Sequence, residues 1–344
     1  MDQMDLAREE FAHLEAKVIL VTGASGFIGM ALTERLIQAN SIFNLKIILI
    51  LLSRSFDDEF VNDLRRAESD FITVVKSDLV HCNFEKEFKN LDIDYVFHAA
   101  TSAISNKSII GEEEMKSSII GAERLLNFFK FGNSAPVFIH LSSGAIYNSD
   151  PKSPEKIKAT NEYFSSPKLS IYAKTKMEIE ELVIGASRSE FVLGSNPRLF
   201  SFYGPRLPLD SHFAIGNFIR DCMTGSTITI RGNFESKRSY LHVGDLVKKL
   251  LILSKKPTLE PLNIGSCAQI SMISLAEIIR EEFNPKVTIE SEFPSAEPNY
   301  YVPEVESTNI YLGDHFERDF RFGLQDWNKW ILGNIKWQIK GARA

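Results

Sequence analysis

The chain has 344 residues, of which 44% are hydrophobic, so it can bury a large core and form one large domain with a smaller one. Its net charge of −6 without long basic runs argues against nucleic acid as a partner, and its longest solidly apolar run, residues 47–52, is far shorter than the ~20 residues that cross a bilayer. Cys82, Cys222 and Cys267 lie far apart without C-x-x-C spacing, which indicates neither disulfides nor a metal site, and the polar, acidic residues 1–10 are unlike a secretion signal, so we expect a cytoplasmic protein with no membrane contact.

Along the chain, a short N-terminal extension with one helix is predicted over residues 1–14. Strand-like segments then alternate with helical stretches, which is the pattern of an α/β protein with a doubly wound parallel sheet, a Rossmann fold. Ligands in such sheets bind beyond the carboxyl ends of the strands. The expected strands are residues 17–21, 46–52, 72–76, 94–98, 137–141 and 191–200.

The first expected strand, 17–21, leads through a glycine-containing turn into a helix predicted over 28–38. Gly23 and Gly26 would let the backbone turn tightly and approach a pyrophosphate at the helix N-terminus, and Gly29 would let the helix pack close to the strand. This strand–turn–helix context favours dinucleotide binding over a turn that only packs. The expected cofactor contacts here are Gly23, Ser25, Gly26, Phe27, Ile28 and Gly29.

The end of the second expected strand bears on the choice of cofactor. Enzymes of this fold that use NAD usually place an acidic residue there, which binds the ribose 2′-hydroxyl. This chain has Ser53 and Arg54, and no carboxylate follows before Asp57. A serine and an arginine can bind a 2′-phosphate, so NADP is favoured over NAD. In the alternative, Arg54 is a solvated loop residue or stacks on the adenine while NAD is bound.

Tyr172 stands four residues before Lys176, and it is the only tyrosine with a lysine at that offset. On a helix the two side chains share a face. A neighbouring ammonium favours phenolate over phenol and lowers a phenol pKa that is normally near ~10. The pair therefore predicts a tyrosine that exchanges protons in the interconversion of an alcohol and a ketone.

The glycine turn followed by the Tyr172 and Lys176 pair resembles the extended short-chain dehydrogenase/reductase family, the NAD(P)-dependent nucleotide-sugar epimerases, dehydratases and reductases. The resemblance covers roughly residues 15–330. It implies a cofactor-binding domain over 15–204 and a smaller substrate-binding lobe over 205–344, with the chain returning to the first domain near 240–265. Further matches come in the family's order: Asp78-Leu79, His98-Ala-Ala100, Ser142 to Tyr147, Arg198 to Pro205, and Arg238 to Asp245.

The resemblance also implies roles for single residues. Ser143 corresponds to the catalytic Ser/Thr, whose hydroxyl binds the substrate oxygen beside Tyr172. Asp78 corresponds to the aspartate that contacts the adenine amino group, and Ser118 stands where an asparagine orders the catalytic Lys176 through water. The expected catalytic residues are thus Ser143, Tyr172 and Lys176, and the further cofactor contacts are Asp78, Leu79, Ala99, Ala100, Thr101, Ser118, Tyr172 and Lys176.

The substrate side is expected in the second half of the chain. Ser201 replaces the asparagine of the family motif, and Arg238 corresponds to an arginine that grips the substrate diphosphate, a task for a forked and permanently charged donor. Asp245 is predicted to cap a helix over 246–253. The expected substrate contacts are Ser143, Ser201, His212, Asn217 and Arg238.

One loop departs from the family pattern. The family's second phosphate-binding arginine is missing from residues 296–301, where Glu297 would repel a diphosphate. Either Tyr300 and Tyr301 supply hydrogen bonds instead, or the nucleotide is held in another way. The family often dimerises through two helices that include the one with Tyr172, so a homodimer is expected.

The residues after Ser143 discriminate among reactions. Dehydratases and sugar-acid decarboxylases of this family resemble one another in carrying an acidic residue directly after the Ser/Thr, whereas this chain has Gly144 and Ala145. We therefore expect a nucleotide-sugar epimerase that acts through a 4-keto intermediate, with an NADPH-dependent keto-sugar reductase as the alternative and a 4,6-dehydratase third. A non-enzymatic cofactor-binding regulator would not be expected to keep the Ser, Tyr and Lys set. The resemblance suggests a step in polysaccharide precursor synthesis.

Overall fold

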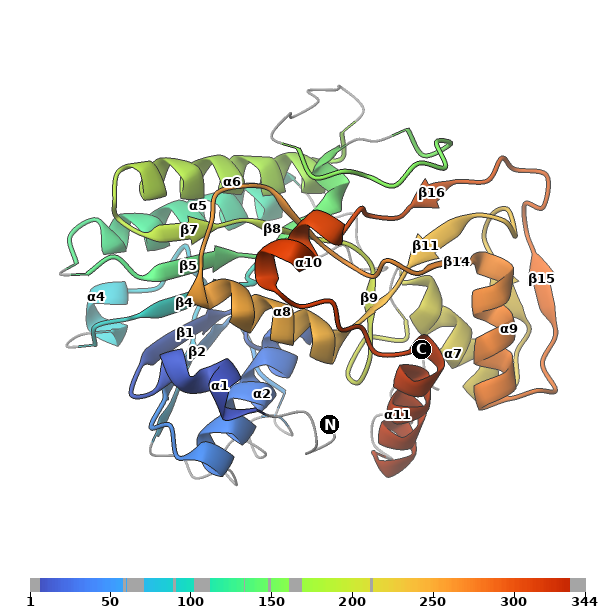
Figure 1. Cartoon of the computed structure of the whole chain (residues 1–344), viewed down its shortest axis with the longest axis horizontal. Helices are drawn as coiled ribbons and strands as arrows, with labels where there is room; N and C mark the ends of the chain where they lie inside the picture. The colour runs from blue at the N-terminus through green and yellow to red at the C-terminus, as the bar shows by residue number, and fades with distance from the viewer. Residues whose placement is uncertain are drawn as a thin grey trace.

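A parallel sheet of six strands forms the larger part of the protein, and a smaller C-terminal lobe lies beside it, at the right of Figure 1. Within the described part of the chain, no helix has the length and apolar character that a membrane span requires. The computed structural model describes residues 7–57, 60, 71–88, 91–101, 112–132, 134–147, 150–160, 169–210 and 213–334.

The order of the strands in the large sheet is β3-β2-β1-β4-β5-β7, and all neighbours are parallel. The chain thus builds outward from β1 in one direction and continues from β4 in the other. The crevice between the carboxyl ends of β1 and β4 is where ligands of such sheets bind. This confirms the predicted doubly wound α/β fold. The strands are β1 (Val18–Thr22), β2 (Ile48–Ser53), β3 (Ile72–Lys76), β4 (Tyr95–His98), β5 (Val137–His140) and β7 (Leu193–Ser195).

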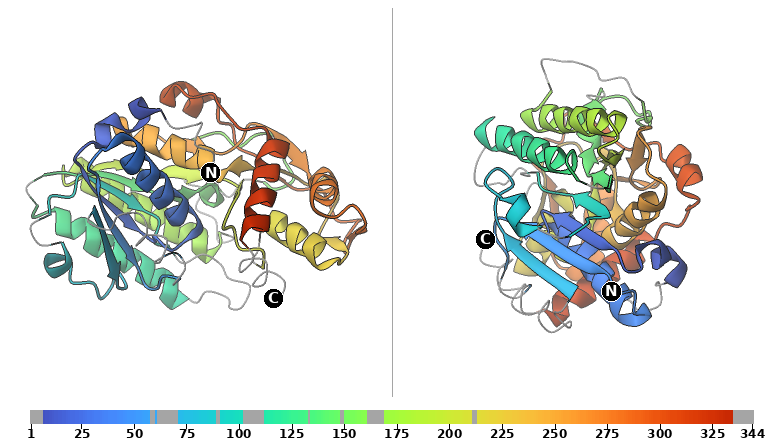
Figure 2. Two further views of the ribbon diagram at one scale, coloured as in Figure 1. Left: turned by 90° about the horizontal axis from the view of Figure 1, so that it is seen from below. Right: turned by 90° about the vertical axis from the view of Figure 1, so that its left-hand side faces the viewer.

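Helices cover both faces of this sheet, as Figure 2 shows. Alternate side chains of β1 point to opposite faces: Ile19 and Val21 belong to a core shared with α2 and α8, and Leu20 belongs to a core shared with α5 and α6. Burial on both faces explains why the central strands read as continuous apolar runs. The helices are α2 (Phe27–Phe43), α4 (Phe84–Glu87), α5 (Glu112–Phe129), α6 (Ile171–Arg188) and α8 (Val243–Lys255).

The segment predicted as one strand over 191–200 forms two strands in different sheets. β7 ends at Ser195, and β8 (Pro197–Leu199) belongs to a second sheet of order β13-β8-β6. Pro197 has no N–H and cannot continue the ladder of β7, which accounts for the break. Its partners are β6 (Ser142–Ser143) and β13 (Leu262–Ile264).

The N-terminal segment packs onto the large sheet's core. Helix α1 (Arg8–Phe11) continues into a 3₁₀ turn (Ala12–Leu14), and Phe11 and Leu14 are fully buried. The Glu10 carboxylate pairs with the guanidinium of Arg35 in α2 at 3.3 Å. Residues 1–6 of the predicted extension lie outside the described residues.

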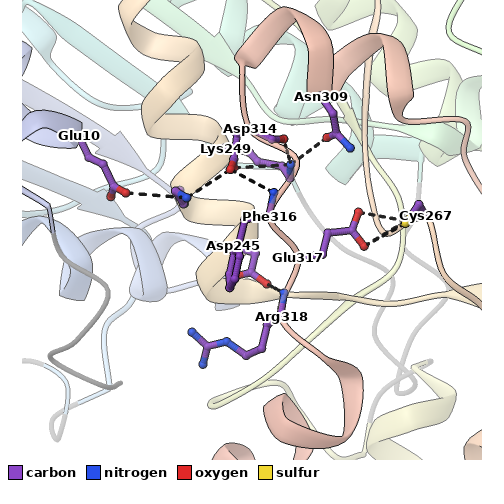
Figure 3. A network of polar contacts seen from close by, with 10 residues as sticks. Glu10, Asp245, Lys249, Cys267, Asn309, Asp314, Phe316, Glu317 and Arg318 are labelled. Carbon is purple, nitrogen blue, oxygen red and sulfur yellow. Dashed lines mark hydrogen bonds and ion pairs between the residues drawn. The ribbon is translucent and has the colours of Figure 1, made fainter.

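The prediction that Asp245 caps the helix after it is wrong. Helix α8 begins earlier, at Val243, and its N-cap is His242, whose side chain accepts from the Gly244 N–H at 3.1 Å. The Asp245 carboxylate instead accepts from the backbone N–H of Arg318 at 2.9 Å, as Figure 3 shows. It therefore ties α8 to the segment that follows α10 (Glu306–Leu312).

The C-terminal lobe has a core of its own around fully buried Trp327. Strands β9 (Phe202–Tyr203) and β12 (Leu241–His242) pair at its junction with the large sheet. Its other elements are α7 (Ala214–Thr224), β10 (Ile228–Ile230), β11 (Lys237–Ser239), β14 (Gln269–Ser271), α9 (Met272–Phe283), β15 (Ile289–Ser291), β16 (Tyr300–Tyr301) and α11 (Phe320–Gly333).

Candidate active site

The glycine turn after β1 packs directly against the end of β4. Gly23 has a φ of +68°, and a Cβ there would lie 2.7 Å from the carbonyl carbon of Ala99. A Cβ on Gly29 would lie 2.3 Å from the carbonyl oxygen of Gly23. Helix α2 begins after Gly26, which has no side chain to cap it. No side chain therefore caps the first N–H groups of α2, which lie at the crevice between β1 and β4. Uncapped N–H groups of this kind are what binds a pyrophosphate.

A Gly29→Ala variant should lose stability and cofactor binding together. The new methyl group meets backbone atoms of Gly23 and Ala24 and cannot be accommodated by a side-chain rotation, so we expect a loss of ~1–3 kcal/mol in the free energy of unfolding. Gly185→Ala in α6 is the matched control, because no atom lies within 4 Å of a Cβ there, and helix propensity should raise stability by ~0.5–1 kcal/mol. Urea unfolding and NAD titration measure both effects; equal responses of the two variants would contradict the close approach.

The predicted contacts for the adenosine half lie at neighbouring strand ends. The hydroxyls of Ser25 and Ser53 are 2.6 Å apart, and Arg54 is exposed beside them. Asp78 follows β3, and one of its carboxylate oxygens accepts from the Val80 N–H at 2.8 Å. The structure thus brings together the residues that the sequence assigned to cofactor binding at β1, β2 and β3.

Helix α6 carries the Tyr172 and Lys176 pair. Its N-cap, Ser170, accepts from the Ala173 N–H at 3.1 Å. The Lys176 ammonium nitrogen lies 5.9 Å from the centre of the Tyr172 ring. It also donates to the Thr101 hydroxyl at 2.9 Å and to the carbonyl of Leu141 at 2.5 Å. The shared face predicted from the spacing is therefore present.

Ser143 of β6 completes this group through a side-chain hydrogen bond with Tyr172. It is 8% exposed, and its hydroxyl oxygen accepts from the Ala145 N–H at 3.2 Å. The predicted substitute for the family asparagine, Ser118, donates to the Glu114 carbonyl of its own helix at 3.1 Å.

Electrostatics at the pair differ from the prediction. Burial raises the pKa of Tyr172, and the hydrogen bond with Ser143 acts in the opposite direction. Burial also lowers the pKa of Lys176 to about 7, opposed by the nearby carboxylate of Glu180. The expected lowering of the Tyr172 pKa is wrong for the protein alone, because the same burial that brings the groups together removes water from both charged forms.

A buried ion pair that the sequence analysis missed lies next to Ser142 and Lys176. Arg198 of β8 donates to both oxygens of Glu180, at 3.1 and 2.8 Å, and these side chains are 3% and 1% exposed. The Ser142 hydroxyl also donates to Glu180, and the Arg198 guanidinium lies 4.8 Å from the centre of the Tyr147 ring. The signal for Glu180 was its position four residues after Lys176, on the same face of α6.

Gly144, at the first position after the expected catalytic residue Ser143, faces an aromatic ring. A Cβ on Gly144 would lie 2.5 Å from the tip of the Phe200 ring. That ring packs against Tyr147 at 6.4 Å and Tyr301 at 4.7 Å between ring centres. The space in which an acidic side chain at this position would begin is therefore filled by Phe200.

The predicted substrate residues lie in the C-terminal lobe and at its junction. Arg238 of β11 donates to the backbone and side-chain oxygens of Asn299. Ser201 is half-buried, and its carbonyl accepts from the Leu241 N–H at 3.0 Å. The side chain of Asn217 accepts from Arg220 at 3.1 Å in α7. His212 lies outside the described residues.

Glu297, which the sequence suggested would repel a diphosphate, has a cationic partner. Its exposed carboxylate forms an ion pair with Lys152. The residues that follow it form β16, which runs parallel to β11 and sets Tyr301 opposite Arg238. The loop that lacks the family's arginine thus places the Tyr301 phenol beside Arg238 and the Phe200 ring.

Residues 19–265 match the model of the NAD dependent epimerase/dehydratase family. The chain belongs to this family. UDP-glucuronic acid decarboxylase 6 of Arabidopsis thaliana is 26% identical over 313 residues, which are 89% of this chain and 86% of that protein. The sequence-based assignment to NAD-dependent nucleotide-sugar epimerases and dehydratases is therefore confirmed at the level of the family.

Solved structures share the fold of this family member over nearly its whole length. An epimerase of Methanothermobacter thermautotrophicus has a TM-score of 0.82 at 23% identity, covering 98% of this chain and 99% of that one. The UDP-glucuronic acid 4-epimerase of Bacillus cereus, in complex with UDP-glucuronic acid and NAD, has a TM-score of 0.74 at 19% identity, covering 92% and 99%.

Proposed function

We propose that the protein is a nucleotide-sugar epimerase that acts through a 4-keto intermediate. The observation that carries this is the contact between the Phe200 ring and Gly144, the residue that follows Ser143. Neither Gly144 nor Ala145 has a side chain that could remove a carbon-bound proton. Tyr172 is then the acid/base of the reaction. Tyr172 then exchanges only the proton of the sugar hydroxyl while a hydride is transferred, which is what epimerisation needs. Loss of water is disfavoured, because it also needs a group that removes a carbon-bound proton.

The residues present fit a nicotinamide dinucleotide. A cradle without Cβ atoms at Gly23 and Gly29 lies next to the uncapped start of α2, and the buried amine of Lys176 stands beside Tyr172. A nicotinamide dinucleotide held there would supply a hydride acceptor in its oxidised form and a hydride donor in its reduced form. The cofactor assignment for the family is NAD.

The chain's own residues handle the hydroxyl and its proton. Ser143 holds the sugar C4 oxygen by a hydrogen bond, and Tyr172 removes the hydroxyl proton as the ketone forms. Tyr172 has to be a phenolate before it takes this proton, and the protonated amine of Lys176 stabilises that negative charge. The proton returns from Tyr172 to the same oxygen once the sugar has presented its other face, and Arg238 holds the diphosphate meanwhile.

A product analysis tests this proposal. The purified protein is incubated with NAD and UDP-hexoses or UDP-uronic acids, and the products are followed by NMR and mass spectrometry. An epimerase gives an isomer of unchanged mass without net change in cofactor absorbance. A product lighter by water or by carbon dioxide would contradict the proposal and place the chain with the dehydratases or decarboxylases.

A keto-sugar reductase is the second candidate, and the exposed Arg54 next to Ser53 favours it. An arginine there can pair with a 2′-phosphate, so NADPH would be the reductant. If so, Arg54→Ala should raise the Kd for NADPH by ~10–100-fold, the value of a charge-assisted hydrogen bond, and leave the Kd for NADH unchanged. Fluorescence titration measures both. Equal affinities of the wild-type protein for the two cofactors would remove the argument for a reductase.

A homodimer through α5 and α6 belongs to the same proposal. These helices lie side by side on one face of the large sheet, and their outer surface includes Ile120 at 44% and Ile171 at 40% exposed. Light scattering after gel filtration measures the mass directly. A monomer at all concentrations would contradict this part of the proposal and leave the chemistry untouched.

A further inference from the structure

A phenol from the C-terminal lobe lies at the catalytic serine. Tyr301 is in β16, which pairs with β11 and sets it opposite Arg238. Its ring lies 4.7 Å from that of Phe200, the ring that faces Gly144. Tyr301 therefore comes to the site from a strand of the C-terminal lobe, whereas Tyr172 belongs to α6 of the large domain.

The Ser143 hydroxyl interacts with both phenols. A side-chain hydrogen bond with Ser143 acts on the pKa of Tyr301 as well as on that of Tyr172. Burial raises the pKa of Tyr301, and the nearby Tyr172 phenol acts in the same direction. Tyr301 therefore stays a neutral phenol, which is a hydrogen-bond donor.

The donor count explains what such a phenol does. A serine hydroxyl has one proton to donate and two lone pairs with which to accept. One lone pair of the Ser143 oxygen accepts from the Ala145 N–H at 3.2 Å. If the Tyr301 O–H donates to the other, the single Ser143 proton is free to point to Tyr172 in the protein alone and to the oxygen of the sugar once it is bound. Without Tyr301 the Ser143 hydroxyl can rotate away from that direction. The orientation of the group that holds the reacting oxygen would then be lost in part of the molecules.

We propose that Tyr301 is a positioning residue for Ser143, through which the C-terminal lobe completes the catalytic centre. This inference rests on the proposed function, because Ser143 is assumed to hold the reacting sugar oxygen. It also gives a physical role to the loop in which a family arginine is missing. Instead of binding the diphosphate, β16 brings a neutral phenol to the sugar end of the site.

The test is a double-mutant cycle of Tyr301→Phe and Ser143→Ala. Tyr301→Phe keeps the ring packed on Phe200 and removes only the hydroxyl, so kcat should fall about tenfold, the value of one oriented hydrogen bond, with KM changed less than twofold. The double variant should be no slower than Ser143→Ala alone, because Tyr301 acts through Ser143. The losses in melting temperature should be non-additive in the same way.

Tyr311→Phe serves as the matched control, because it removes a phenol hydroxyl that donates to the Lys256 carbonyl at 2.9 Å, away from Ser143. It should leave kcat and KM unchanged. Additive losses in the cycle, or an unchanged kcat in Tyr301→Phe, overturn the positioning role while leaving the proposed function intact. A wild-type protein that turns over no nucleotide sugar overturns the proposed function, and the positioning role with it.

Discussion

Tyr172→Phe should lower kcat by about 10²–10⁴-fold with the fold intact, because it removes the group that we propose as the acid/base for a sugar hydroxyl. The phenyl ring keeps the packing of Tyr172, and the cofactor cradle at Gly23 and Gly29 is separate from it. The Kd for NAD should rise far less than kcat falls, since Tyr172 is one of many expected cofactor contacts. Single-turnover kinetics on the nucleotide sugar measure the loss, and circular dichroism checks the fold.

Tyr95→Phe is the control for the loss of a phenol hydroxyl. Tyr95 starts β4, at the edge of the sheet opposite to the site, and its hydroxyl donates to the His13 carbonyl at 3.3 Å. This variant should retain wild-type turnover. If Tyr172→Phe retained it as well, another group would have to move the proton, and the mechanism proposed for Tyr172 would be rejected.

The sequence predicts the large sheet well because its central strands are buried on both faces. Such strands appear as continuous apolar runs whose positions do not depend on tertiary detail. The segment 191–200 was predicted as one strand, yet it divides at Asn196 between two sheets. Pro197 was the available signal, since a residue without an N–H cannot continue the interior ladder of a strand.

The candidate site was predictable where its residues are close in sequence. The offset between Tyr172 and Lys176 fixes a shared helix face whatever the rest of the fold does. Their pKa values were not predictable, because burial opposes the effect of a neighbouring charge and is set by the surrounding fold. Tyr301 reaches Ser143 only through the pairing of β16 with β11, which no local pattern encodes.

The same limit explains why Asp245 was misassigned. An aspartate before an apolar periodic segment is a common N-cap, and no local pattern indicates that the helix starts three residues earlier than predicted, at Val243. Its true partner, the Arg318 N–H, lies far along the chain and meets α8 only after the C-terminal lobe has folded back.

Glu180→Gln should be the most destabilising of these changes, because it removes the carboxylate charge that pairs with the buried guanidinium of Arg198. Breaking one side of such a pair costs ~3–5 kcal/mol in the free energy of unfolding. Glu181→Gln is the matched control: the next residue of α6 is exposed, so a change within about 0.5 kcal/mol is expected. Urea unfolding of the two variants measures the difference, and similar losses would show that the pair adds nothing specific.

The ion pair also links the fold to the site, because Glu180 accepts from Ser142, the neighbour of Ser143, and its charge raises the pKa of Lys176. In Glu180→Gln the Lys176 pKa should fall further below its usual range, which favours the neutral amine. Turnover should then decline more steeply than stability as the pH rises.

A double variant, Glu180→Leu with Arg198→Met, removes both charges and should recover most of the stability, since well-packed apolar groups can replace a buried pair. It should not recover activity, because the support for Ser142 and Lys176 is still missing. Stability and activity measured side by side in these two variants separate the structural role of the pair from its role in the site.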